Sequence, residues 1–195
     1  MRVTVVAGIV AAAVWIIVKM IFFSTQEVGY DVTPLVLLSM LLILGAISVG
    51  LYYTKRKETE ETNALHDIKN GMTAGVPYAV IVSIFIYFYY SQIDPEYNAH
   101  QLAEAEYGLV TELDKPGKLE ELRKENEEME VMTKEEIIKR AMENHRSFYN
   151  PSSTSTLALL GLILLSTLNS IFVTIIYRKV VFKPRDNSPG VIDNK

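Results

Sequence analysis

The sequence contains no cysteine, which excludes disulfide bonds, a lipid anchor attached to cysteine and chemistry based on a thiol. It also contains no phosphate-binding P-loop, nucleophile elbow, zinc-protease motif or dinucleotide-binding fingerprint. These absences remove the best-marked classes of nucleotide-binding, hydrolytic and redox enzymes. We therefore expect a protein that is not an enzyme and that binds no cofactor.

Charge is nearly absent from four long apolar runs, although the chain holds 19 basic and 23 acidic side chains. The runs are Val3–Phe23, Pro34–Tyr53, Met72–Tyr90 and Leu157–Tyr177. A helix needs about 20 residues to cross the hydrocarbon core of a bilayer, and isolated spans in lipid must be helical. The sequence predicts an all-α integral membrane protein with transmembrane helices at residues 3–23, 34–53, 72–92 and 157–177. The polar tail, residues 182–195, is expected to be disordered.

The first run has a second interpretation, because Arg2, an apolar stretch and Ala11-Ala12-Ala13 resemble a cleavable signal peptide. The apolar stretch continues past the alanines through Val14–Val18. A retained signal anchor fits this length better, and whether the span is ever cleaved stays open.

Basic residues predict the threading, because loops rich in lysine and arginine stay in the cytoplasm. The loop Ser24–Thr33 has none of them. They gather in the loop Thr54–Gly71 and after Tyr177, as Lys55, Arg56, Lys57, Lys69, Arg178, Lys179, Lys183, Arg185 and Lys195. We expect both termini inside and the segment between the third and fourth spans outside.

That outer segment, residues 94–150, is acidic and reads as helices. Asp94 caps a helix, Pro95 suits its first position and Glu96 favours the positive end of its dipole. Leu119–Glu130 is expected to form a charge-dense helix, and Thr133 and Glu136 have the spacing of a capping box. We expect the helices to pack on each other or on the membrane surface, either as a solvated cap or as a partner-binding surface. The excess of acid outside argues against nucleic acid as a partner.

The fourth run carries polar side chains on one helical face, Ser166, Asn169, Ser170 and Thr174. One interpretation is hydrogen bonding between helices, worth less than about 2 kcal/mol per contact. The other is a path for a polar solute. Asn169 is then the most informative residue, because an amide in hydrocarbon needs a partner.

Three further features bear on helix packing and charge. Small residues four apart allow close helix contacts, in the pairs Gly8 and Ala12, Ala46 and Gly50, and Gly71 and Gly75. Lys19 is the only charge within the four runs and is expected to extend to the outer interface. Pro77 is expected to kink or to start the third span.

His100 has a carboxylate one turn to either side, from Glu96 and Glu104. This arrangement has the form of a metal site. No second histidine is near in sequence, so ordinary exposed ion pairs are the better interpretation and we expect no metal.

Several motifs follow one another in a characteristic order. A basic stretch, Lys55–Lys57, is followed by the glycine-containing entry Gly71–Gly75, the aromatic run Tyr87–Tyr90 with Asp94-Pro95, and a basic end at Arg178-Lys179. From about Val5 to Lys183 the chain resembles a family of bacterial membrane proteins, domain of unknown function 4199, typical of Bacteroidota. The resemblance implies a bacterial inner membrane. Together with the threading predicted from the basic residues, this places residues 94–155 in the periplasm. The resemblance implies no catalytic or binding residue.

These observations favour a non-enzymatic accessory or interaction protein, which contacts other membrane or envelope proteins or a second copy of itself. The alternative is a small oligomeric transporter or channel subunit that uses the polar face of the fourth span. Beyond the lipid bilayer, the sequence names no partner.

Overall fold

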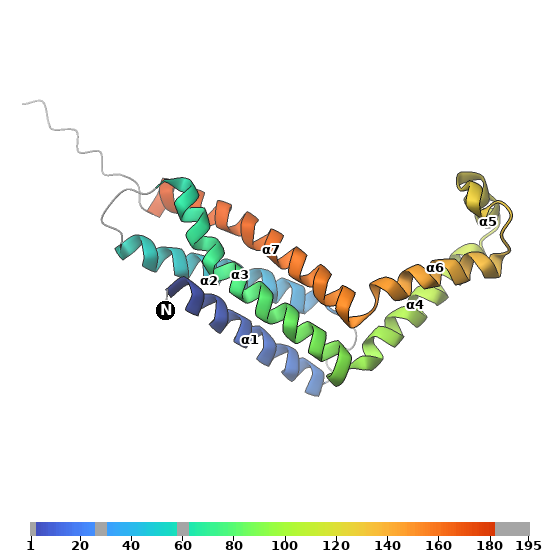
Figure 1. Ribbon diagram of the computed structural model, residues 1–195, viewed down its shortest axis with the longest axis horizontal. Coiled ribbons are helices and arrows are strands. Elements are labelled where there is room, and N and C mark those ends of the chain that lie inside the picture. The colour runs from blue at the N-terminus through green and yellow to red at the C-terminus, as the bar shows by residue number, and fades with distance from the viewer. Residues whose placement is uncertain (1–2, 26–30, 58–62, 182–195) are drawn as a thin grey trace, which may run out of the picture. The chain divides into compact units, whose positions relative to one another are not determined.

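The computed structural model describes residues 3–25, 31–57 and 63–181, and all regular structure within them is helical (Figure 1). The predicted disordered tail, 182–195, lies outside these residues. The long apolar helices are α1 (Val3–Thr25), α2 (Thr33–Lys57), α3 (Ala64–Phe88) and α7 (Pro151–Ile176). The segment between α3 and α7 contains α4 (Pro95–Leu113), α5 (Lys118–Glu125) and α6 (Lys134–Phe148). Short turns of π-helix, η1 (Tyr89–Ile93) and η3 (Tyr177–Val181), extend α3 and α7, and a 3₁₀ turn, η2 (Glu127–Met129), follows α5.

Four helical segments are long and apolar enough to cross a membrane: Val3–Thr25, Thr33–Lys57, Ala64–Ile93 and Pro151–Val181. Each contains one of the predicted spans. The outward-facing side chains of these helices are mostly large and apolar, as Ile17, Leu41 and Leu164 illustrate. This composition suits a lipid environment.

Polar caps explain why α3 and α7 begin earlier than their apolar runs. Ahead of α3, the His66 N–H donates to Asn63 Oδ1 at 2.8 Å. Ahead of α7, the Ser153 N–H donates to Asn150 Oδ1, also at 2.8 Å. Asparagine satisfies amide groups that a helix start leaves without partners. Pro77 lies inside α3 and does not start it.

The chain divides into two compact units. Unit 1 contains Met1–Trp15, Pro34–Tyr78 and Ile163–Lys195, and unit 2 contains Ile16–Thr33 and Ala79–Leu162. In unit 1 the core is apolar around Ile43, Ile47 and Leu51. Two buried hydrogen bonds join its helices, from Trp15 Nε1 to the Leu35 carbonyl at 3.1 Å and between the hydroxyls of Ser39 and Tyr78 at 2.8 Å.

Unit 2 contains an antiparallel hairpin in which α4 and α6 run side by side (Figure 1). Leu113 of α4 and Ile137 and Met142 of α6 are buried. Of the two expected arrangements, packing of the outer helices on each other is therefore confirmed, and packing on the membrane surface stays a prediction. The predicted helix over Leu119–Glu130 is wrong in its second half, because α5 ends at Glu125 and Asn126 has an extended backbone.

Candidate functional site

A close seam joins α3 to α7 in unit 1. A Cβ added at Gly75 would lie 2.5 Å from Ser166 Cβ, and one added at Gly71 would lie 3.0 Å from Ser170 Cβ. Real Cβ atoms do not approach other carbons as closely as the first of these distances, so the two helices meet where only glycine fits. Ser166 and Ser170 are completely buried in this contact.

Two other glycines of unit 1 also lie at points where two helices approach closely. A side chain at Gly8 of α1 would overlap the Ala74 carbonyl of α3. One at Gly50 of α2 would lie 3.0 Å from the Thr4 methyl of α1. Next to these contacts, the Thr73 hydroxyl donates to the Thr4 hydroxyl at 2.7 Å. The prediction that small residues allow close helix contacts is confirmed.

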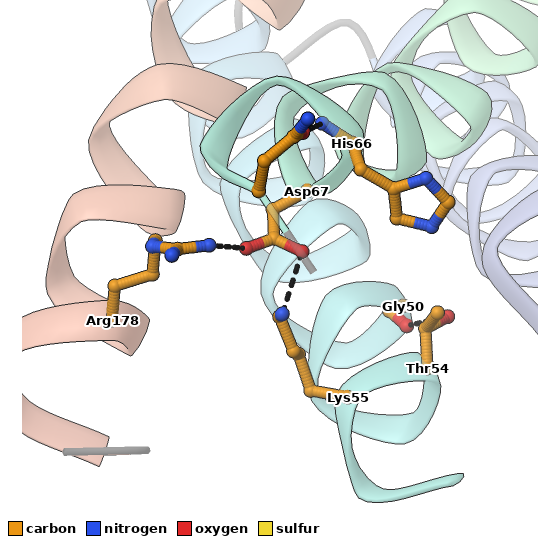
Figure 2. A network of polar contacts seen from close by, with 7 residues as sticks. Gly50, Thr54, Lys55, His66, Asp67 and Arg178 are labelled. Carbon is orange, nitrogen blue, oxygen red and sulfur yellow. Dashed lines mark hydrogen bonds and ion pairs between the residues drawn. The ribbon is translucent and has the colours of Figure 1, made fainter. Parts of the chain in front are cut away.

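At one end of the α3–α7 seam lies a buried ion-pair cluster, shown in Figure 2. The Asp67 carboxylate of α3 is 1% exposed and accepts contacts from two cations. Lys55 Nζ of α2 lies 2.7 Å from Oδ1, and Arg178 Nη1 of η3 lies 2.8 Å from Oδ2. Lys55 is 12% exposed and Arg178 is 40% exposed, so the cluster runs from the interior to the surface.

The helices that carry these charges are tied together beside the cluster. The Tyr177 hydroxyl of η3 donates to the Ser48 carbonyl of α2 at 2.8 Å. The Thr54 hydroxyl donates to the Gly50 carbonyl one turn back on α2 at 2.9 Å (Figure 2). The Tyr177 bond joins α2 to the end of the α7 segment beside the cluster, whereas the Thr54 bond lies within α2.

Unit 2 has its own buried cation. The Lys19 ammonium of α1 lies 4.3 Å from the ring centre of Tyr89 and 5.4 Å from that of Tyr90. The Tyr89 hydroxyl donates to Asp94 Oδ2 at 3.3 Å. The other oxygen of Asp94 accepts the Tyr97 N–H at 3.2 Å and so caps α4. One carboxylate thus serves both the start of α4 and the aromatic surface that covers Lys19.

The far end of the hairpin, residues 114–133, is braced by polar contacts. Lys134 pairs with Asp114, and Arg140 pairs with Glu128 at 2.5 Å. The Arg123 guanidinium donates to the Met132 carbonyl at 2.6 Å. An open hollow beside it is lined by Glu120, Arg123, Lys124 and Glu130. Next to these contacts Val131 is 90% exposed.

Comparison with known protein families adds one match. The model of a family described as "Protein of unknown function (DUF4199)" matches residues 6–179. The chain belongs to this family. No curated protein and no solved structure matches it. Membership confirms the resemblance seen in the sequence and carries no activity with it, so the roles of residues rest on geometry.

The structure separates the four residues of the predicted polar face. Ser166, Ser170 and Thr174 are buried, whereas Asn169 is only half-buried. Within the part of the chain that the structure describes, the hydroxyls of Ser170 and Thr174 are buried without a hydrogen-bond partner. The buried part of the face, Ser166 and Ser170, packs against the glycines of α3 by its small size.

The predicted helix start has the expected geometry. Asp94 is the N-cap of α4, Pro95 occupies the first turn and Glu96 is the acidic residue of that turn. Thr133 and Glu136 form the complete capping box of α6. For His100, no group of three or more metal-ligating side chains occurs among residues 3–25, 31–57 and 63–181.

Sequence reasoning missed two sets of contacts. It placed Lys19 at the outer interface, which stays a prediction, and did not foresee that the ring of Tyr89 covers its ammonium. Asp67 lies in a stretch assigned to a loop, and its contacts with Lys55 and Arg178 were not foreseen. The helical period carried a signal for it, since Asp67, Gly71 and Gly75 are each four residues apart and share one face.

Proposed function

We propose that this protein is a non-enzymatic accessory protein of a bacterial inner membrane, and that its α4–α6 hairpin contacts another envelope protein. In this proposal four helices cross the bilayer. Both termini lie in the cytoplasm and residues 94–155 lie in the periplasm. The asymmetry of basic residues supports that orientation.

The observation that carries the proposal is the contrast between a braced hairpin and its uncovered end. The hairpin has a capped start at Asp94, a capping box at Thr133 and buried Ile137. These contacts lie within the hairpin itself. The side chain of Val131, by contrast, is 90% exposed among charged residues. A pre-organised support reduces the conformational entropy lost on binding, and Val131 would add an apolar contact to such an interface.

The α7 polar face supports the alternative of a transporter or channel subunit less well. A path for solute would need Ser166, Ser170 and Thr174 to face an opening. Here the two serines lie against Gly75 and Gly71 of the same chain. Their burial is explained by helix packing, so no second role is required of them.

A photo-crosslinking residue at position 131 tests the proposal in living cells. We expect a discrete adduct from Val131 and none from Lys139, an exposed position on α6 that serves as the matched control. Val131→Asp is expected to weaken the captured complex about tenfold, because a carboxylate replaces an apolar contact. An adduct of twice the chain's mass would identify the partner as a second copy. Equal adducts from both positions, or none from a folded protein at position 131, would overturn the proposal.

A further inference from the structure

We propose that Asn169 of α7 forms a hydrogen bond with Asn169 of a second copy of this chain inside the bilayer, and that this bond sets the register of two parallel α7 helices. The inference rests on the proposed membrane insertion and is independent of any role of the hairpin. It starts from an amide that has no hydrogen-bond partner although it lies in an apolar helix.

The amide of Asn169 is unsatisfied within the single chain. Among residues 3–25, 31–57 and 63–181, its side chain makes no hydrogen bond. The buried side-chain atoms without a partner in the same residues belong to Ser83, Arg123, Ser170 and Thr174. Asn169 is half-buried and is not one of them. Its amide can therefore be reached from outside the chain.

The position of Asn169 along α7 makes this amide costly. The residue lies twelve positions after Leu157 and eight before Tyr177, the two ends of the apolar run. At about 1.5 Å per residue, the amide is about 18 Å from one end and about 12 Å from the other. The hydrocarbon core of a bilayer holds no water that could satisfy a polar group. The partner must therefore be a polar group of another membrane helix.

A stripe of side chains along α7 offers such a helix a place to pack. Leu165, Asn169, Phe172 and Ile176, all in unit 1, follow one another at spacings of four, three and four residues. This is the spacing of the contact positions in a pair of supercoiled helices. Phe172 and Ile176 are exposed and Leu165 is half-buried, so the stripe is open to a second helix. One asparagine among apolar contact positions fixes the register and the number of helices.

A second copy of the chain fits this stripe. Identical chains cross the membrane in the same direction, so their α7 helices run parallel and their Asn169 side chains lie at the same depth. The amide is complementary to itself, because each copy can donate an N–H and accept with its carbonyl. A two-fold axis between the copies brings the same residue of each chain together. A different membrane protein would need its own polar group at this depth.

The first arm of the test is disulfide crosslinking in native membranes, which the absence of cysteine makes specific. Phe172→Cys places one thiol on the stripe. Ile171→Cys is the matched control, because Ile171 is also exposed but lies about 100° around the helix from Phe172. We expect an oxidant to produce an adduct of twice the chain's mass from Phe172→Cys and little from Ile171→Cys.

The second arm measures self-association of the purified full chain in phosphatidylcholine vesicles. Copies labelled with a donor or an acceptor dye at Lys57→Cys report association by energy transfer as lipid is added. Asn169→Leu should weaken association about tenfold, since it removes the hydrogen bond between the helices. Asn169→Gln keeps an amide and should lie between wild type and Asn169→Leu. Thr167→Val is the control, because the Thr167 hydroxyl already donates to the Ile163 carbonyl of its own helix, and it should change association little.

The proposal is overturned by wild type that stays monomeric at high protein-to-lipid ratio or by equal crosslinking from Phe172→Cys and Ile171→Cys. It is also overturned if Asn169→Leu associates as well as Thr167→Val, or if Phe172→Cys forms its adduct with a different protein. Failure of position 131 to capture a partner leaves the result unaffected, because no residue of the hairpin is changed. Reversed threading leaves it unaffected as well, since both copies would be reversed together.

Discussion

Gly75 and Ser166 lie so close together that a Cβ added to the glycine would be 2.5 Å from the serine's own Cβ. The serine's hydroxyl oxygen would be equally near. This contact and the one between Gly71 and Ser170 set the spacing of α3 and α7 in unit 1. In lipid, helices gain little from hiding apolar surface from one another, so van der Waals contact at small residues is a main source of their association. Ser166 and Ser170 of α7 therefore take part in packing against α3.

The first prediction concerns this seam. Gly75→Ala is expected to destabilise the protein by about 1–3 kcal/mol, the usual cost of overpacking a close contact. Gly45→Ala is the control, because a Cβ at Gly45 of α2 would meet nothing within 4 Å. Alanine favours helix, so the control should be neutral or slightly stabilising. Thermal unfolding in detergent measures both variants, and equal midpoints would contradict the proposed role of the seam.

The second prediction separates the members of the ion-pair cluster. Asp67→Asn leaves two cations without their shared carboxylate, and breaking a buried pair in this way costs about 3–5 kcal/mol. Arg178→Gln leaves Asp67 with Lys55, and Arg178 is 40% exposed, so solvent reduces its contribution to about 1 kcal/mol or less. Unfolding by denaturant gives the two free energies. The interpretation fails if Arg178→Gln is the more damaging change.

Much of the fold follows from local signals. The apolar runs locate the four long helices because lipid-facing helices must be apolar over a fixed length. Asp94 and Thr133 locate the starts of α4 and α6 because a cap needs only its own next turn. The four-residue spacing of small residues likewise predicts that they lie at helix contacts. It does not predict which helix each residue contacts, because partners such as Gly75 and Ser166 are distant in sequence.

The ion-pair cluster was missed for a different reason. Asp67 precedes the apolar run that begins at Met72, so hydropathy assigns it to a loop. The Asn63 cap extends α3 by two turns and brings Asp67 onto the face that carries Gly71. Arg178 likewise lies four residues after Thr174, on the face of the seam. If the α3 face is extended one turn back from Gly71 and the α7 face one turn beyond Thr174, Asp67 and Arg178 are expected to lie near each other. The rings that cover Lys19 belong to the π-helical turn Tyr89–Ile93, for which the sequence has no simple signal.

The third prediction concerns Lys19. Lys19→Met keeps the length of the side chain and removes the charge over Tyr89, so it should cost up to about 2 kcal/mol, the value of a desolvated cation–π contact. Lys19→Arg should retain most of that stability because it keeps a cation over the ring. Lys69→Met, which removes an exposed lysine of α3, is the control. Thermal unfolding of the three variants decides the point, and an equal effect of Met at positions 19 and 69 would contradict it.

The fourth prediction concerns pH and the start of α6. The pKa of Glu136 is lowered from its usual value of 4.5, first by the hydrogen bond from the Thr133 N–H and then by the Thr133 hydroxyl. Because the folded pKa is the lower one, this stabilisation is complete above pH 4.5 and is lost as the pH falls through the folded value. Amide exchange in the first turn of α6, corrected for intrinsic rates, should therefore accelerate below about pH 4.5. In Glu136→Gln this acid-dependent step should be absent, and a step of the same size in the variant would argue against the carboxylate as its source.

The last prediction concerns membrane orientation, on which the search for a partner depends. The chain has no cysteine, so a single introduced thiol reports one position. Glu121→Cys in α5 and Lys57→Cys at the end of α2 are both exposed sites. In intact spheroplasts we expect a membrane-impermeant maleimide to label position 121 and to reach position 57 only after lysis, since basic loops stay inside. The reverse pattern would put the hairpin in the cytoplasm. The partner would then be a cytoplasmic protein, and the basic end of unit 1 would face the outer leaflet. Labelling of both positions before lysis would mean that both lie outside, so that an even number of membrane crossings, or none, separates the two sites.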